Sequence, residues 1–124
     1  MILIEPEIRF GDEIRAPDIV GWRTERYDEP DSGPFLVAPD WVCEVLSPST
    51  AVFDRKEKLP LFARHGVSHV WLVDPKAETL EVYRRQGELW LLLATHGGDE
   101  EVRAEPFDAD ALDLGALWRV PGVP

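Results

Sequence analysis

The feature that most constrains the fold of this chain is the short segment PDWVCEVLS, which begins at Pro39 and ends at Ser47. Aromatic and β-branched residues fill the segment and proline bounds it, which predicts a central strand of a packed sheet. Glu44 interrupts the apolar residues, and an uncompensated charge inside such a strand is costly. The segment therefore predicts both a sheet and a group near Glu44 that compensates its charge.

The sequence before this strand predicts a hairpin and a loop. Apolar and polar residues alternate on both sides of the turn signal GDE, from the first residues to IRAPDIVGW, which predicts a β-hairpin. Residues 23–39 hold four Asp or Glu and three Pro, which predicts an irregular, exposed loop.

The sequence after the strand predicts one principal helix and a meander. In DRKEKLPLFARHG, Asp54 and Glu57 have the spacing of a capping box, Gly66 supplies the end, and Pro60 predicts a kink or a late start. Short connections join HVWLVDP, TLEVYRR and LWLLLATH, which predicts three antiparallel strands. A short helix is expected in the tail, and the fold class is mixed α/β with a mostly antiparallel sheet.

Composition and residue spacing limit the functions that this chain can have. No apolar run approaches the ~20 residues of a membrane span, and the first residues lack signal-peptide character, so we expect a cytoplasmic protein with no membrane contact. The single cysteine, Cys43, has apolar neighbours and predicts a buried thiol. The three histidines lack zinc-ligand spacing. The net charge of −11 opposes simple electrostatic binding of nucleic acid.

The spacing of acidic residues indicates a metal site. Strand alternation places Asp40 and Glu44 on one face, but about 13 Å of strand separates them, which is too far for both to bind one ion. Asp18, at the start of the apolar segment IVGW, would lie close to Glu44 if the two strands pair. Two carboxylates with open water positions suit Mg²⁺ (or Mn²⁺). Lys58, on the following helix, could steady developing charge.

Other interpretations of these residues stay open. Asp18 and Asp40 both follow proline, where aspartate often only caps a turn. Glu44 could be solvated on an exposed face of the sheet, or it could form a buried ion pair with Lys58 or Arg55.

The segments APDIVGW, PDWVCEVLSPST, DRKEKLPLFARHGVSHVWLVDP and TLEVYRR together resemble the bacterial putative restriction endonuclease family, a branch of the PD-(D/E)xK nuclease superfamily. The resemblance runs from about Pro6 to Trp118. It implies a restriction-endonuclease-like core and Mg²⁺-dependent hydrolysis of phosphodiester bonds. It also implies that Asp18 and Glu44 are the two acids of the motif, which would be metal ligands and catalytic residues.

The sequence departs from the superfamily pattern in two places. Leu46 stands where the motif's lysine usually lies, and Lys58 occupies the place of a lysine moved to the following helix, with Asp54 as its support. Relatives usually carry an N-terminal helical segment with a further glutamate, so we expect a single domain, residues 1–124, that lacks this segment. Glu5 or Glu7 would then be the candidate for a third acidic ligand.

The acidic residues and the family resemblance are consistent with two functions. The first is a Mg²⁺-dependent endonuclease that acts on nucleic acid, with DNA as the expected substrate. The second is a catalytically inactive module of the same fold that acts through protein contacts, which the negative charge and the absent segment favour. A homodimer would cover apolar sheet surface in either case.

Overall fold

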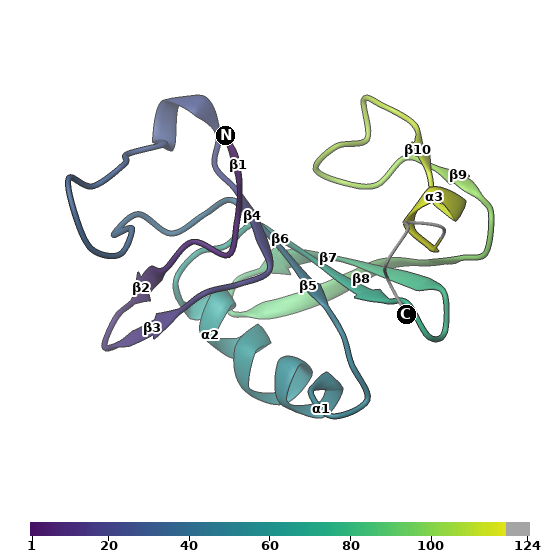
Figure 1. The fold of residues 1–124 in the computed structure, drawn as a ribbon, viewed down its shortest axis with the longest axis horizontal. Coiled ribbons are helices and arrows are strands. Elements are labelled where there is room, and N and C mark those ends of the chain that lie inside the picture. Colours follow the sequence, from purple (N-terminus) through teal and green to yellow (C-terminus); the bar gives the residue numbers. More distant parts are fainter. Residues whose placement is uncertain (119–124) are drawn as a thin grey trace.

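The computed structural model describes residues 1–118. A six-stranded sheet forms its centre, in the order β1-β4-β5-β6-β7-β8 (Figure 1). The strands are β1 (Ile2–Ile4), β4 (Ile19–Gly21), β5 (Trp41–Val45), β6 (His69–Asp74), β7 (Thr79–Gln86) and β8 (Leu89–Gly97). Neighbouring strands are antiparallel except β5 and β6, which are parallel and joined by the helical segment. The predicted mixed α/β fold, with its mostly antiparallel sheet, is confirmed.

Short elements at both ends of the described chain form two further sheets of two strands each, β2-β3 and β9-β10. The predicted hairpin is interrupted, so that each arm contains two strands. Near its tip, β2 (Ile8–Phe10) pairs with β3 (Glu13–Arg15), and further from the tip β1 pairs with β4. The predicted loop contains a single 3₁₀ turn, η1 (Thr24–Arg26). After β8 come β9 (Glu101–Val102), β10 (Leu112–Asp113) and α3 (Gly115–Trp118), which is the short helix expected in the tail.

The principal helix has three consecutive parts: α1 (Ala51–Phe53), the π-helical turn η2 (Asp54–Lys58) and α2 (Leu59–Arg64). In η2 the backbone N–H of Leu59 donates to the carbonyl of Asp54, five residues earlier. Pro60 has no N–H to donate back along the helix, which accounts for a wider turn just before it. The expected irregularity at Pro60 is therefore present, and Gly66, with φ of +81°, follows the helix end.

The predicted capping box is wrong. Asp54 lies inside the helical segment, and its carboxylate forms an ion pair with Lys58 in place of a bond to a backbone N–H. The residue before the first turn is Thr50, which makes no side-chain capping bond.

Two apolar clusters cover the two faces of the sheet. On one face, Val42 and Leu46 of the β5 region pack with Leu59 and Phe62 of α2. On the other face, Trp41 and Cys43 pack with residues of the β9, β10 and α3 region. The alternation predicted for this strand is confirmed, and it directs Glu44 toward the helical segment. Within residues 1–118, no helix is long and apolar enough to span a membrane.

Candidate active site

Glu44 lies between the sheet and the helical segment with only 3% of its surface exposed. Its Oε2 atom is 3.3 Å from Nζ of Lys58, whereas Oε1 is buried and has no hydrogen-bond partner among residues 1–118. Burial raises the pKa of Glu44 to about 7, the charges of Asp18 and Asp54 add to this, and Lys58 opposes it. Glu44 is thus a carboxylate whose charge is compensated only in part, with one buried oxygen that accepts no hydrogen bond from residues 1–118.

Lys58 bridges two buried carboxylates. Its Nζ lies 2.9 Å from Oδ1 of Asp54 and 3.3 Å from Oε2 of Glu44, and 22% of its side chain is exposed. Burial lowers the pKa of Lys58, but the bonds to Asp54 and Glu44 outweigh burial, so the pKa is raised overall. Lys58 is therefore a fixed cation, and because an ammonium has three N–H donors, one donor is left after these two contacts.

Asp18 lies across from Glu44 at the point where β4 begins. Its Oδ2 accepts a hydrogen bond of 2.7 Å from the backbone N–H of Val45. Ile19 pairs with Cys43, so extending the antiparallel register by one residue places Asp18 opposite Glu44 on the same face. Cβ atoms in such a pair are about 4.5–5.5 Å apart. The extended register and the bond to Val45 therefore place Asp18 beside Glu44, and these two residues are called the acidic pair below; their role as metal ligands stays a prediction.

Cys43 is buried as expected, on the opposite face from Glu44. Burial raises its pKa to about 12, and the charges of Glu44 and Asp18 add to the effect. The thiol therefore stays protonated at neutral pH and is a poor nucleophile.

The two candidates for a third acidic ligand differ in position. The backbone N–H of Glu5 donates to the carbonyl of Asp18, so Glu5 follows β1 directly beside Asp18, whereas Glu7 bonds through its carbonyl to Phe35. Both side chains are exposed. Among the described residues 1–118, the structure gathers no set of three or more His, Cys, Asp or Glu able to hold one ion. Asp18 and Glu44 therefore have no third protein ligand among residues 1–118.

Asp40 takes the structural role that its position after proline indicates. Its carboxylate accepts a hydrogen bond from the backbone N–H of Arg23 and forms an ion pair with Arg26. It lies just before β5, at the opposite end of the strand from Glu44, and it takes no part in the acidic pair.

A neighbouring polar cluster was not anticipated from the sequence. Arg55 of η2 donates to Glu81 of β7 at 2.9 Å, and the hydroxyl of Tyr83 also donates to Glu81 at 3.2 Å. Leu72 pairs with Glu44 on one side and with Glu81 on the other, so Glu81 lies on the same face of the sheet. In the sequence, only the alternation of TLEVYRR indicates which face of its strand Glu81 lies on. Placing Glu81 near Arg55 also requires the register of β5 and β6 with β7.

Chemically, the arrangement suits a small hard cation. Mg²⁺ commonly binds through one or two carboxylates and completes its shell with water and substrate phosphate. Within the described part of the chain, Glu44 Oε1 is a buried acceptor without a partner, and Asp18 supplies a second carboxylate across the extended strand pair. The residues present therefore fit a Mg²⁺ or Mn²⁺ ion, although Lys58 already compensates part of the charge of Glu44.

Comparisons with known proteins agree with this fold. A solved structure described as a putative nuclease belonging to DUF820, from Anabaena variabilis, superposes with a TM-score of 0.72 at 29% sequence identity. The match covers 94% of this chain but 66% of that neighbour, so the chain spans just under two thirds of its length. No curated protein matches the chain.

The family scan matches residues 2–114 to the family Uma2, described as putative restriction endonuclease. This range holds every strand of the central sheet, the helical segment and the acidic pair. The chain therefore belongs to the putative restriction endonuclease family.

Proposed function

We propose that this chain is a divalent-metal-dependent endonuclease that hydrolyses phosphodiester bonds of nucleic acid. The observation that carries the proposal is the buried Glu44 with one oxygen unpartnered, placed opposite Asp18 and beside Lys58. Family membership and the nuclease-like neighbour support the same class of activity. DNA is the expected substrate.

In this proposal, Asp18 and Glu44 would hold Mg²⁺ or Mn²⁺. The ion, when bound, would supply Lewis-acid polarisation and neutralise charge on the scissile phosphate. The hydrogen bond from the backbone N–H of Val45 fixes one oxygen of Asp18 next to the residue that follows Glu44.

Lys58 would have an electrostatic role in the same centre. Its contacts with Asp54 and Glu44 fix the ammonium group, and the remaining N–H can donate to a phosphate oxygen as negative charge develops. Asp54 would act as a positioning residue, since it contacts Lys58 and not the substrate.

A direct test is calorimetric titration of Mn²⁺ into the parent protein, Asp18→Asn and the control Asp28→Asn, which alters an exposed loop aspartate. We expect saturable binding in the parent and the control, and its loss in Asp18→Asn. If the parent does not bind Mn²⁺, the metal site is refuted.

Cleavage assays complete the test. Parent and Glu44→Gln are compared on plasmid DNA, single-stranded DNA and RNA with Mg²⁺, and Ca²⁺ serves as the non-cleaving control. We expect Glu44→Gln to lose activity by about 10²-fold or more. Equal cleavage by the parent and Glu44→Gln would contradict the proposed centre.

The ion pair between Lys58 and Glu44 also favours a second candidate, an inactive module that acts through protein contacts. Lys58 compensates Glu44 without a metal, as a purely structural ion pair would. In that case Mn²⁺ should leave the melting temperature unchanged, whereas an ion that binds only the folded chain should raise it.

The homodimer and the cytoplasmic location remain predictions. Support for a dimer comes from the edge strand β8, where Leu89, Leu91 and Leu92 are exposed. Sedimentation of the parent and of Leu91→Asp would test it, with a dimer expected for the parent and a monomer for the variant.

A further inference from the structure

The outer end of the helical segment carries an exposed aromatic ring beside the candidate active site. Phe53, the last residue of α1, is 46% exposed, and Val52 before it is 74% exposed. The centroid of the Phe53 ring lies 5.8 Å from Nζ of Lys58, the same ammonium that contacts Glu44. The ring is therefore one side chain away from the acidic pair and still open to solvent.

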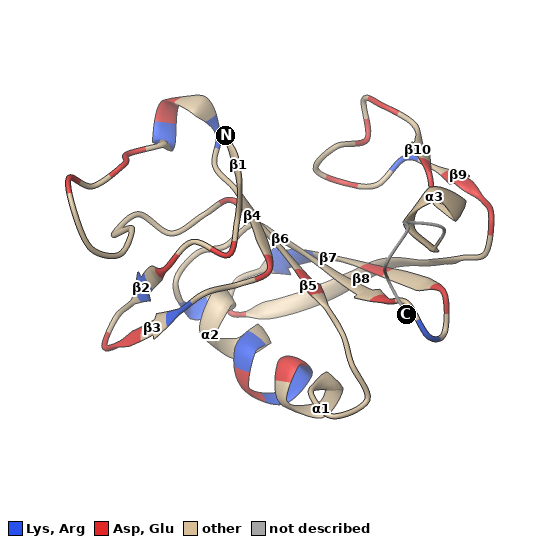
Figure 2. Ribbon diagram, in the orientation of Figure 1, with Lys and Arg blue, Asp and Glu red and all other residues tan. Residues whose placement is uncertain are grey.

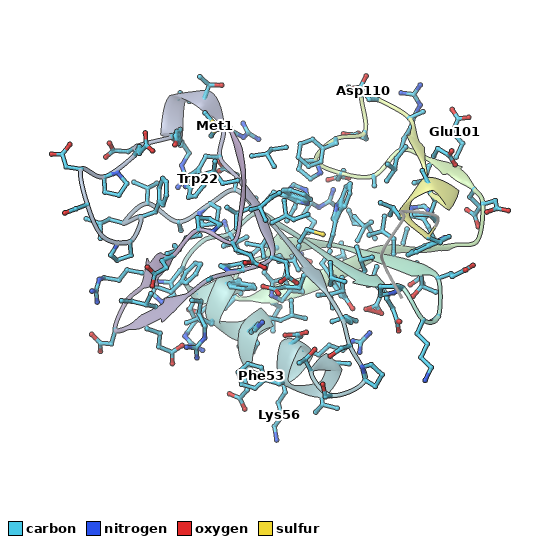
Figure 3. The ribbon with its side chains drawn as sticks, in the orientation of Figure 1. Met1, Trp22, Phe53, Lys56, Glu101 and Asp110 are labelled. Carbon is cyan, nitrogen blue, oxygen red and sulfur yellow. The ribbon has the colours of Figure 1, made fainter. Side chains whose placement is uncertain are left out.

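The π turn explains why Phe53 and Lys58 come together. These residues are five apart, and a turn with bonds between residues i and i+5 brings such a pair to the same side of the helix. Lys56, three residues after Phe53, is also exposed. Figure 3 shows Phe53 and Lys56 at the same outer end of the helical segment.

The charge around this ring differs from the charge of the rest of the chain. Residues 51–66 hold four Lys or Arg against two Asp or Glu, although the chain as a whole carries −11. In contrast, residues 98–118 hold seven Asp or Glu against a single Arg. In Figure 2 the helical segment carries blue and red segments together, whereas red segments predominate along the β9 and β10 region. Of these two regions, the helical segment would therefore repel an anionic ligand less.

An exposed aromatic ring with a neighbouring lysine has the chemistry of a single-strand binding platform. Unpaired bases stack on aromatic side chains, and lysines contact the phosphates between them. Bases inside a duplex are already stacked, so their faces are not available to such a ring. A protein partner could also cover Val52 and Phe53, but the local positive charge favours a polyanion.

We propose that Phe53 and Lys56 bind one unpaired nucleotide beside the acidic pair, with its base stacked on Phe53 and its phosphate on Lys56. This inference rests on the proposed nuclease function and names its substrate class as single-stranded nucleic acid or the unpaired flank of a duplex. Lys58 lies between the platform and Glu44, so the next phosphate along the strand would reach the acidic pair.

The test is fluorescence anisotropy with a labelled oligothymidine and a duplex of equal length, at low ionic strength in EDTA so that no cleavage occurs. We expect the parent to bind the single strand more tightly than the duplex. Phe53→Ala should weaken single-strand binding by roughly 5- to 150-fold, the range for one stacked base, while Phe53→Trp keeps it. The control Val52→Ala, in the same patch but without a ring, should bind like the parent.

Lys56→Ala should weaken binding of both oligonucleotides and reduce the slope of log affinity against log salt by about one. Three results would overturn the inference: no binding of the single strand by the parent, unchanged binding by Phe53→Ala, or equal losses on single strand and duplex in Phe53→Ala. Circular dichroism of Phe53→Ala confirms that the exposed substitution leaves the fold intact.

The outcome can be separated from the proposed function. If Glu44-dependent cleavage is observed but Phe53→Ala binds normally, the platform is refuted and the nuclease stands. If Phe53 controls single-strand binding but Glu44→Gln cleaves like the parent, the proposed centre is refuted and the binding site stands.

Discussion

Glu44 of the central sheet and Glu105 in the turn after β9 meet cations in opposite environments. Glu44 is almost fully buried, has one oxygen that no residue up to Trp118 contacts by a hydrogen bond, and has a raised pKa. Glu105, beside β6 and β7, keeps 34% of its side chain exposed and accepts bonds from Arg84 and from His69 Nε2 at 3.1 and 3.0 Å. The bond to His69 lowers the pKa of Glu105, slight burial opposes this, and Arg84 adds to the lowering.

The difference shows what each ion pair does for the chain. Glu105 is satisfied on the surface, and its carbonyl also accepts a 2.7 Å bond from Trp71 Nε1, so it fastens the C-terminal region to the sheet. Glu44 instead keeps a charge where burial disfavours it. Such a cost is typical of functional positions, where a perturbed pKa coincides with a specific charged partner.

We expect the largest loss of stability when the cation is removed from the buried site. Lys58→Met should reduce the free energy of unfolding at pH 8 by about 3–5 kcal/mol, because it leaves Glu44 and Asp54 buried without their partner. Urea denaturation measures the change. Lys56→Met is the control on the same helical segment, and a similar small loss in both variants would contradict the buried ion pair.

The pH dependence of stability should come next in size. The folded-state pKa of Glu44, about 7, exceeds the ordinary value of 4.5, so the folded chain binds the proton more tightly than the unfolded chain. Stability from this group is therefore full below pH 4.5 and declines as the pH rises to 7, by about 3 kcal/mol. Glu44→Gln should abolish this decline in urea denaturation series. An equal decline in the variant would assign it to other groups.

The exposed pair should give the smallest effect. Arg84→Met should cost about 0–1 kcal/mol at pH 7, because the ion pair with Glu105 is open to solvent. The pKa of Glu105 is lowered, so its stabilising contribution is present at neutral pH and is lost as the pH falls below the ordinary glutamate range. The difference between variant and parent should therefore disappear at acid pH, and its persistence there would point to lost packing of the arginine stem.

Much of the buried site could be predicted from the sequence because local rules govern it. Period-two alternation placed Glu44 on the helix side, and the position of Lys58 in the following helix brought it within reach. The link between Glu81 and Arg55 was not predictable in the same way, since it depends on the register of β5, β6 and β7. The Glu105 cluster was missed because β9 and β10 have two residues each, too few to show a period.

The parallel pairing of β5 with β6 has a consequence for the order in which the chain assembles. The strands β6, β7 and β8 follow one another through short turns, so they can pair early, whereas Asp18 meets Val45 across 27 residues and Glu44 meets Lys58 across the helical crossover. Closing long loops costs entropy before the contacts reward it. We therefore expect Asp18 and Glu44 to come together after the meander has paired when the full chain refolds from denaturant.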